Sequence, residues 1–415
     1  MSEWKTLSSI TSKIGSGSTP RGGNSVYSDS GISFIRSQNV LDMDFSTENL
    51  AFINDNQAEK LNNVIVEKND ILLNITGDSI ARCTVVPEAI LPARVNQHVS
   101  IIRCKNTEES KYVMYYLQYM KKYLLQISKV GGTRNALTKE AIGKLPIKMS
   151  DVCNKISKIL DNIDQKIQIN NQINQELEAM AKTLYDYWFV QFDFPDQDGK
   201  PYKSSGGKMV YNPELKREIP EGWGVEKLGE LAQFKNGINY EKTSSGSEKV
   251  KIINVRNISS STIFINQTDL DEIFLENDKS TNFIVNEGMI LITRSGIPGA
   301  TRLVSELEAK TVYSGFIIAS EVNVLIYKNL IFYYLKNVEE VLKNQSAGTI
   351  MKNISQSVLT DMVVSLPPQN LLLKFNSIID NLLEQMKTVQ RQNQELTQLR
   401  DWLLPMLMNG QVKVE

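Results

Sequence analysis

Apolar side chains recur at steps of three and four residues in two long segments of the chain, around residues 152–190 and 375–406. A continuous stripe of this period predicts a long amphipathic helix in each segment. At about 1.5 Å per residue, each helix would be on the order of 55 Å long. The positions assigned to the two stripes are Ile156, Leu160, Ile163, Ile167, Asn170, Ile173 and Leu177, and then Phe375, Ile379, Leu382, Met386, Val389, Gln392 and Leu396.

Each stripe is too narrow to stabilise an isolated helix, so each helix needs a partner. We expect the two helices to pair with each other in antiparallel directions. Each stripe has one polar break near its middle, Asn170 in the first and Gln392 in the second. If these two face each other, Ile173 faces Val389, and the polar pair fixes the register. An ordinary coiled coil or a homodimer interface would give the same stripes.

The chain is also a tandem repeat, with similar segments about 219 residues apart. Five matches carry the alignment: Trp4 with Trp223, 34–40 with 252–258, 66–73 with 285–292, 115–117 with 333–335, and 159–162 with 378–381. The order is therefore a globular unit, a helix, a second globular unit and a second helix.

The predicted fold class is α+β, with two mixed α/β domains separated by two long antiparallel helices related by an internal pseudo-twofold repeat. Short apolar runs such as 71–75 and 290–293 are typical of buried strands. The predicted boundaries are 1–150 for the first domain, 151–190 for the first helix, 191–222 for a polar linker, 223–367 for the second domain, 368–408 for the second helix and 409–415 for a tail.

Composition limits the function of the chain. The 415 residues carry a net charge of −1, which argues against a basic protein that coats DNA without specificity. The three cysteines are far apart and form no metal-binding pattern. The first residues do not form a secretory signal, and no apolar run is long enough for a membrane helix. These features predict a cytoplasmic protein.

Several short motifs, weak alone but strong in this order and duplication, resemble those of one family. They are Ser16 to Pro20, Lys235 to Gly237 with Tyr240, Asp70 to Leu73 before Gly77, Ile290 to Ile292 before Gly296, Asn96 to His98, and the two linker segments 199–203 and 217–223. The whole chain is similar to the specificity subunit of a type I restriction-modification system.

That resemblance implies a role in defence against phage DNA. Each globular unit would be a target recognition domain for one half of a bipartite, asymmetric DNA sequence. The helices would act as a spacer that fixes the gap and would dock two methyltransferase subunits, which restriction subunits join in the full complex. The chain itself would need no cofactor, because partner subunits would bind S-adenosylmethionine, and ATP with Mg²⁺ where a restriction subunit is present.

Base recognition requires Arg or Lys for guanine and Asn or Gln for adenine, on loops that enter a groove. The candidates chosen on this basis are Thr19, Arg21, Arg36, Gln38, Asn39, Arg82, Arg134 and Asn135 in the first unit, and Asn236, Tyr240, Lys242, Arg256, Asn257, Arg294 and Lys352 in the second. Any one of them could instead be a solvated loop residue or an Asn or Thr that satisfies its own turn.

No catalytic residue is predicted. The sequence lacks the Asn/Asp-Pro-Pro-Tyr/Phe run of amino-methyltransferases, a Walker A motif and a metal-spaced His/Cys cluster. Its single histidine, His98, is expected to be a core or hydrogen-bonded residue. Three alternatives remain: an enzyme acting alone, a coiled-coil scaffold without DNA specificity, and the same architecture in a related phage-defence or orphan DNA-modification system.

Overall fold

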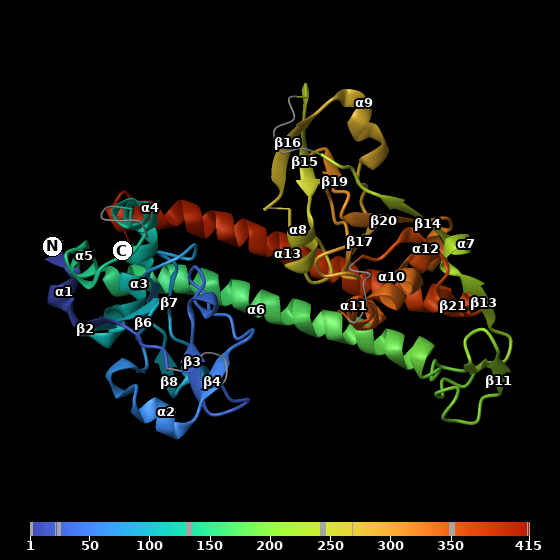
Figure 1. Cartoon of the computed structure of the whole chain (residues 1–415), viewed down its shortest axis with the longest axis horizontal. Helices are drawn as coiled ribbons and strands as arrows, with labels where there is room; N and C mark the ends of the chain where they lie inside the picture. Colours follow the sequence, from blue (N-terminus) through green and yellow to red (C-terminus); the bar gives the residue numbers. More distant parts are fainter. Residues whose placement is uncertain are drawn as a thin grey trace. The chain divides into compact units, whose positions relative to one another are not determined.

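The structure is a computed structural model that describes residues 3–20, 22, 26–129, 135–240, 246–267, 269–347, 353–412 and 414. It divides into two compact units (Figure 1). Unit 1 comprises Met1–Asn170 with Gln392–Glu415, and unit 2 comprises Asn171–Arg391. Each unit therefore combines one globular domain with parts of both long helices.

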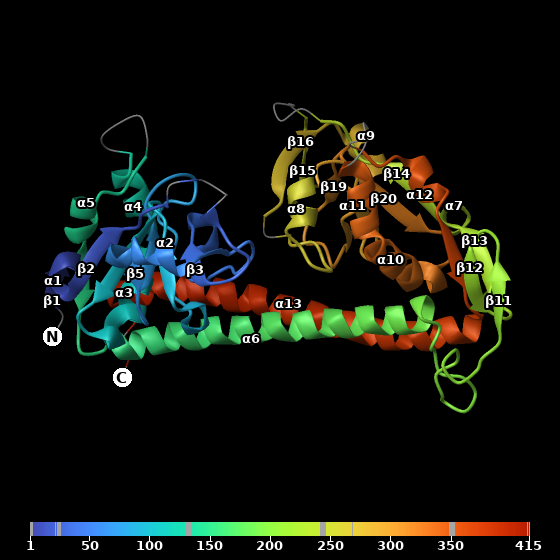
Figure 2. The ribbon, with the colours of Figure 1, turned by 60° about the horizontal axis from the view of Figure 1, so that its bottom comes forward.

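The long helices are α6 (Cys153–Tyr185), which continues as a short π-helix over Asp186–Val190, and α13 (Gln369–Asn409). Within each unit, the two helices lie side by side (Figures 1 and 2). In unit 1, Asn170 Nδ2 donates to Gln392 Oε1 at 3.4 Å and to Asn393 Oδ1 at 2.8 Å. Asp164, earlier in α6, pairs with Arg400, later in α13, at 2.8 Å, so the directions are antiparallel.

Burial along the predicted stripes is uneven. The fully buried members are Ile156, Leu160, Asn170, Leu177, Phe375, Ile379, Leu382 and Met386. Ile163, Ile167, Val389 and Leu396 are half-buried, whereas Ile173 is 39% exposed and Gln392 is exposed. Ile173, which was predicted to face Val389, is the most exposed apolar member of the two stripes. Two helices alone cover a narrow strip, and the buried apolar members all belong to a core to which a globular domain also contributes.

Unit 1 contains two four-stranded sheets. The first has the order β2 (Thr11–Ser16), β9 (Val99–Cys104), β6 (Ile71–Asn74) and β7 (Cys83–Val85), and it is antiparallel. The second has the order β4 (Ala51–Ile53), β3 (Ile32–Ile35), β8 (Ala93–Val95) and β5 (Ile65–Val66), in which β3 and β8 are parallel. A separate pair joins β1 (Glu3–Thr6) to β10 (Pro146–Met149).

Helices cover the first sheet of unit 1. The segments are α1 (Leu7–Ile10), α3 (Ser110–Tyr119), α4 (Lys121–Ile127) and α5 (Lys139–Gly143). Their apolar faces form one core with β6 and with Leu404 and Leu407 of α13. A second core lies around the β3–β8 sheet, where α2 (Asp55–Glu59) packs.

Unit 2 repeats this topology, with three strands in place of four in its second sheet. Its antiparallel sheet has the order β14 (Ala232–Asn236), β20 (Ile317–Val322), β17 (Ile290–Thr293) and β18 (Thr301–Leu303). Its second sheet has the order β16 (Asp271–Leu275), β15 (Glu248–Ile253) and β19 (Thr311–Tyr313), with β15 and β19 parallel. The outer pair is β13 (Gly224–Lys227) with β21 (Val363–Leu366).

The helices of unit 2 have helical counterparts in unit 1, except that a 3-10 turn at Ser37–Asn39 stands in the place of α8. They are α7 (Leu228–Leu231), α8 (Val255–Ser259), α9 (Asn277–Ser280), α10 (Lys328–Asn337), α11 (Glu339–Ala347) and α12 (Gln356–Thr360). The most similar pair is α3 and α10, which begin just after β9 and β20 and pack their buried tyrosines into the domain core.

The polar segment 191–222 is more ordered than a bare linker. It contains the hairpin β11 (Met209–Asn212) and β12 (Arg217–Pro220). Phe194 stacks on Tyr202 and on Trp223, with ring centroids 4.7 and 5.3 Å apart. The Arg217 guanidinium lies 4.7 Å above the Phe192 ring. The frequent Gly, Ser and Lys residues predicted a linker, whereas the aromatic side chains pack this segment against the core of unit 2.

Candidate nucleic-acid interface

Most of the predicted DNA contacts in unit 1 lie at one edge of its sheets. Because β3 and β8 are parallel, the loops after both strands meet at the same edge. The pairings of β2 and β6 with β9 bring the ends of those strands to the start of β9, at this edge as well. We call these loops rim 1, which comprises residues 17–20, 36–40, 75–82, 96–98 and 135–137.

The matching edge of unit 2 is built in the same way. Its loops follow β14, β15, β17 and β19 and meet the start of β20. We call these loops rim 2, which comprises residues 236–240, 254–259, 294–300, 314–316 and 353–354.

The two rims share a backbone framework. Four hydrogen bonds recur at equivalent places, all between 2.8 and 3.0 Å. Gly17 N donates to Val99 O as Gly237 N does to Ile317 O, and Asn96 N donates to Ile35 O as Ser314 N does to Ile253 O. Ile75 N donates to His98 O as Arg294 N does to Phe316 O, and Leu137 N donates to Ile75 O as Ile354 N does to Arg294 O. These four shared contacts of the frame are thus made by peptide groups and do not depend on which side chains the loops carry outward.

One glycine in each rim makes this framework possible. A Cβ atom on Gly17 would lie 2.1 Å from Val95 O, and one on Gly237 would lie 2.3 Å from Ser314 O. Only glycine lets the loop after β2 or β14 lie directly against the backbone at the end of β8 or β19. The Gly/Ser-rich composition of these loops therefore has a structural cause in both domains.

Asn39 and Asn257 are equivalent residues whose structural role corrects their prediction as base contacts. Both are buried, at 0% and 2% exposure. Asn39 Nδ2 donates to Ser46 O at 3.0 Å and its Oδ1 accepts from Arg36 N. Asn257 Nδ2 donates to Asp269 O at 2.9 Å and its Oδ1 accepts from Asn254 N. Each amide cross-links its own loop, the local role that Asn often has in turns.

The arginines near these asparagines are also held by neighbours. Arg36 is half-buried, its Nη2 donates to Asn49 O, and its guanidinium lies 5.5 Å from the Tyr27 ring centroid. Arg256 contacts carboxylate oxygens of Asp271 at 2.8 Å and Asp269 at 2.5 Å.

The carboxylates raise the pKa of Arg256 above its usual value, chiefly through the hydrogen bond to Asp271. Tyr240 belongs to the same network, because its hydroxyl donates to Asn254 Oδ1 at 3.2 Å and Asn254 Nδ2 donates to Asp271. Arg256 is therefore orientated by two carboxylates, whose negative charges also balance its positive charge.

Rim 1 contains a chain of side-chain hydrogen bonds that joins three of its loops. The Thr19 hydroxyl donates to Gln97 Oε1. Gln97 Nε2 lies 3.0 Å from His98 Nε2, and His98 Nδ1 lies 2.6 Å from Thr76 Oγ1. His98 is thus a hydrogen-bonded residue, as predicted. Gln97 is exposed and was not among the predicted contacts, although its place beside His98 in a family-like motif was a usable signal.

The remaining predicted contacts differ in exposure. Gln38, Asn135 and Asn236 are exposed, whereas Arg82 and Arg294 are half-buried. Within the described part of the chain, Arg294 Nε is buried without a hydrogen-bond partner. The other four predicted contacts, Arg21, Arg134, Lys242 and Lys352, lie outside the described residues.

Comparison with known proteins identifies the family. Residues 1–179 and 220–398 both match the type I restriction modification DNA specificity domain. The chain belongs to this family. The type I restriction enzyme MjaIX specificity subunit of Methanocaldococcus jannaschii is 28% identical over 336 residues, which cover 78% of this chain and 74% of that protein. The HindI specificity subunit of Haemophilus influenzae is 23% identical over 342 residues, which cover 68% of this chain and 72% of that protein.

The same fold occurs in a solved structure. The S subunit of a type I restriction-modification system from M. genitalium has a TM-score of 0.54 at 14% identity, with 100% of this chain and 97% of that one covered. Family membership makes this chain a DNA-binding specificity subunit that works with other subunits of a restriction-modification complex and is not itself the catalyst.

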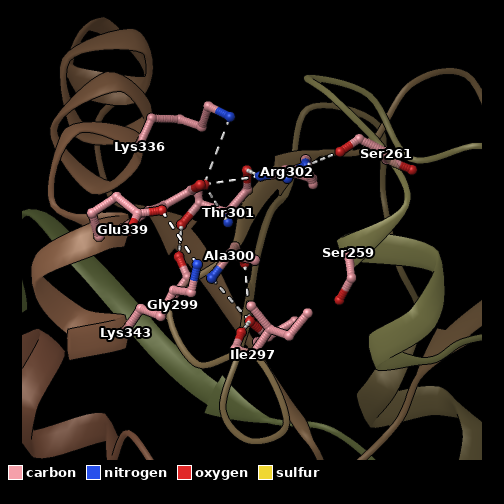
Figure 3. Close-up of polar contacts among 12 residues, drawn as sticks. Ser259, Ser261, Ile297, Gly299, Ala300, Thr301, Arg302, Lys336, Glu339 and Lys343 are labelled. Atoms are coloured by element: carbon pink, nitrogen blue, oxygen red, sulfur yellow. Dashed lines mark hydrogen bonds and ion pairs between the residues drawn. The ribbon is translucent and has the colours of Figure 1, made fainter. Parts of the chain in front are cut away.

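In this specificity subunit, a charged network joins the antiparallel sheet of unit 2 to the helices that pack on it (Figure 3). Glu339 accepts from Arg302 Nη1 at 2.9 Å and from Thr301 N at 2.7 Å. Lys336 Nζ lies 3.7 Å from Glu339 and 3.6 Å from Glu178 of α6. Burial lowers the pKa of Lys336, and the neighbouring Arg302 adds to that shift. The network therefore joins β18 to α6 through the end of α10.

Among the described residues, no group of His, Cys, Asp and Glu side chains is placed to hold a metal ion. In the same part of the chain, no helix is both long and apolar enough to cross a membrane. Burial raises the pKa of the Cys83 and Cys104 thiols, to about 11 in the case of Cys104, so these two cysteines stay protonated at neutral pH.

Proposed function

We propose that this specificity subunit recognises a bipartite, asymmetric DNA sequence, with one half contacted by rim 1 and the other by rim 2. The observation that carries the proposal is the shared framework of the rims combined with different side chains at equivalent positions. Thr19, Gln97 and His98 of rim 1 correspond to Asn239, Gly315 and Phe316 of rim 2. Similar frames suit similar docking on DNA, and unlike side chains suit unlike base pairs.

The long helices support the second part of the proposal, the docking of two methyltransferase subunits, which restriction subunits join in the full complex. The domain-to-helix contacts recur in the two units. Lys111 pairs with Asp161 at 2.5 Å, and its counterpart Asn329 donates to Asp380 Oδ1 at 2.8 Å. Two equivalent helix and domain junctions would suit two copies of one partner. With DNA as its target, we place the chain in the cytoplasm.

Adenine-methylation mapping tests this function. One strain expresses the chain with the methyltransferase encoded beside it, and a control strain expresses the methyltransferase alone. We expect a non-palindromic, two-part motif only in the first strain. Exchange of residues 1–150 for another domain of the family should change one half of the motif and leave the other half and the gap unchanged.

An unchanged methylation pattern would contradict the proposal. It would favour a scaffold or a different DNA-modification system, and the partners would then be identified by affinity purification of the tagged full chain. A motif whose two halves both change after the exchange would show that the domains do not recognise DNA independently.

A further inference from the structure

The short connection that follows the second parallel strand, β8 or β19, is held in the same way in the two rims. It comprises Asn96–His98 between β8 and β9, and Ser314–Phe316 between β19 and β20. Matching hydrogen bonds hold both ends of each connection, from Asn96 N and Ser314 N at one end and to His98 O and Phe316 O at the other. Side chains of this connection therefore start from equivalent backbone positions, and their chemistry can be compared directly.

In rim 2 the connection presents an exposed aromatic ring. Phe316 is 62% exposed. Its neighbour Gly315 lies so close to the opening loop that a Cβ atom would be 2.1 Å from Asn239 Oδ1. The connection is thus pressed against its own domain at Gly315 and turns a phenyl ring to solvent at Phe316. Ile297, also in rim 2, is 46% exposed, so the surface is apolar at two points.

In rim 1 the same connection presents an amide. Gln97 is held on one side by the Thr19 hydroxyl and on the other by the His98 ring, which Thr76 holds in turn. An amide carries two donor hydrogens and two acceptor lone pairs, and the two contacts use part of each set. A fixed amide with a donor and an acceptor still available matches the N6 and N7 edge of adenine.

We propose that this connection carries a discriminating side chain in each domain. Gln97 recognises an adenine of the first half-site by hydrogen bonds, and Phe316 contacts the C5 methyl group of a thymine in the second half-site. The inference rests on the proposed function, and it names the positions and the chemistry by which the two halves differ. An apolar contact with the thymine methyl is one of the standard means of base recognition in the major groove.

The first test alters the DNA and leaves the protein intact. The purified complex of the full chain with its methyltransferase binds duplexes in which each thymine of the second half-site is replaced by uracil in turn. Loss of the methyl contact should weaken binding roughly 4-fold at one position. In the F316A complex, binding to the unmodified duplex should fall roughly 5- to 10-fold, and the same uracil should cause no further loss.

The matched control for F316A is F274A. Phe274 is 47% exposed on β16 and pairs with Lys249, at the end of β15 away from rim 2. F274A should keep the uracil effect and the wild-type motif. For rim 1, Q97A should relax one adenine position of the first half-site, while Q126A, at an exposed position of α4, should leave the motif unchanged. F316L, which keeps an apolar side chain, should lose less binding than F316A.

The outcomes distinguish a failure of this inference from a failure of the proposed function on which it rests. A wild-type complex that methylates no two-part motif would overturn the proposed function. A wild-type motif that is unchanged in F316A and Q97A would overturn the inference alone. A second half-site without thymine, or a uracil effect of equal size in wild type and F316A, would overturn the role of Phe316 even if the variant were poorly folded.

Discussion

Unit 1 and unit 2 share the strand order of their antiparallel sheets and the hydrogen-bonded backbone of their rims, yet they stabilise their interiors differently. Behind the rim 1 sheet, Gln118 donates to Cys83 O at 3.0 Å and Lys121 pairs with Asp42 in a partly exposed contact. At the matching places behind rim 2 stand Lys336 and Glu339, which form the largely buried network with Arg302. The shared fold therefore fixes the positions at which these contacts form, while the side chains that form them differ between the two units.

The largest difference should appear when one member of each contact is removed. E339A leaves the buried Arg302 guanidinium without its carboxylate, and we expect a loss of about 3 kcal/mol in the free energy of unfolding of unit 2. K121A removes a partly exposed pair from unit 1 and should cost less than about 1 kcal/mol. Urea unfolding of the full chain, with hydrogen exchange to assign the loss to one unit, measures both. E339Q, which still accepts from Thr301 N, should fall between them.

The buried amides should instead respond alike. N39A and N257A each leave backbone groups of a rim loop without partners, so each should cost about 2 kcal/mol. Hydrogen exchange in residues 36–49 and 254–271 is the direct measurement, because those loops should open first. Unequal losses would break the equivalence of the two frames. N63A is a control in unit 1, since Asn63 is exposed and its contact with Lys13 is made by its backbone carbonyl.

A smaller difference should separate two equivalent tyrosines. The Tyr115 hydroxyl donates to Asp164, whereas the buried Tyr333 hydroxyl has no hydrogen-bond partner among the described residues. Y115F should therefore destabilise unit 1 by about 1.5 kcal/mol, and Y333F should be neutral or slightly stabilising in unit 2. Thermal unfolding of the two variants beside wild type gives the comparison, and a clear loss in Y333F would reveal a partner for that hydroxyl.

Much of the architecture could be predicted from the sequence, because it repeats itself. Two apolar stripes of helical period predicted the two long helices, and the polar breaks predicted that Asn170 would meet Gln392. The fold class and the family followed from duplicated motifs whose order is more specific than any one of them.

The site was harder to predict, since residue type does not determine burial. Asn39 and Asn257 have the amides that base recognition requires, but tertiary packing turned both inward. Arg256 met two acids that lie 13 and 15 residues away along the chain. Trp4 and Trp223 align in sequence, yet Trp4 is 63% exposed and Trp223 is 9% exposed. The aromatic hairpin segment after α6 covers Trp223, and no periodicity marks that contact.

The peptide-held frame of the rims has an evolutionary consequence. Most mutations that alter function also threaten stability, because the same side chains serve both purposes. Here the four hydrogen bonds that the two rims share belong to the main chain, so a substitution at Gln97 or Phe316 leaves them in place and changes the groups presented to solvent. A population of such chains can explore new DNA targets one substitution at a time, without passing through poorly folded intermediates.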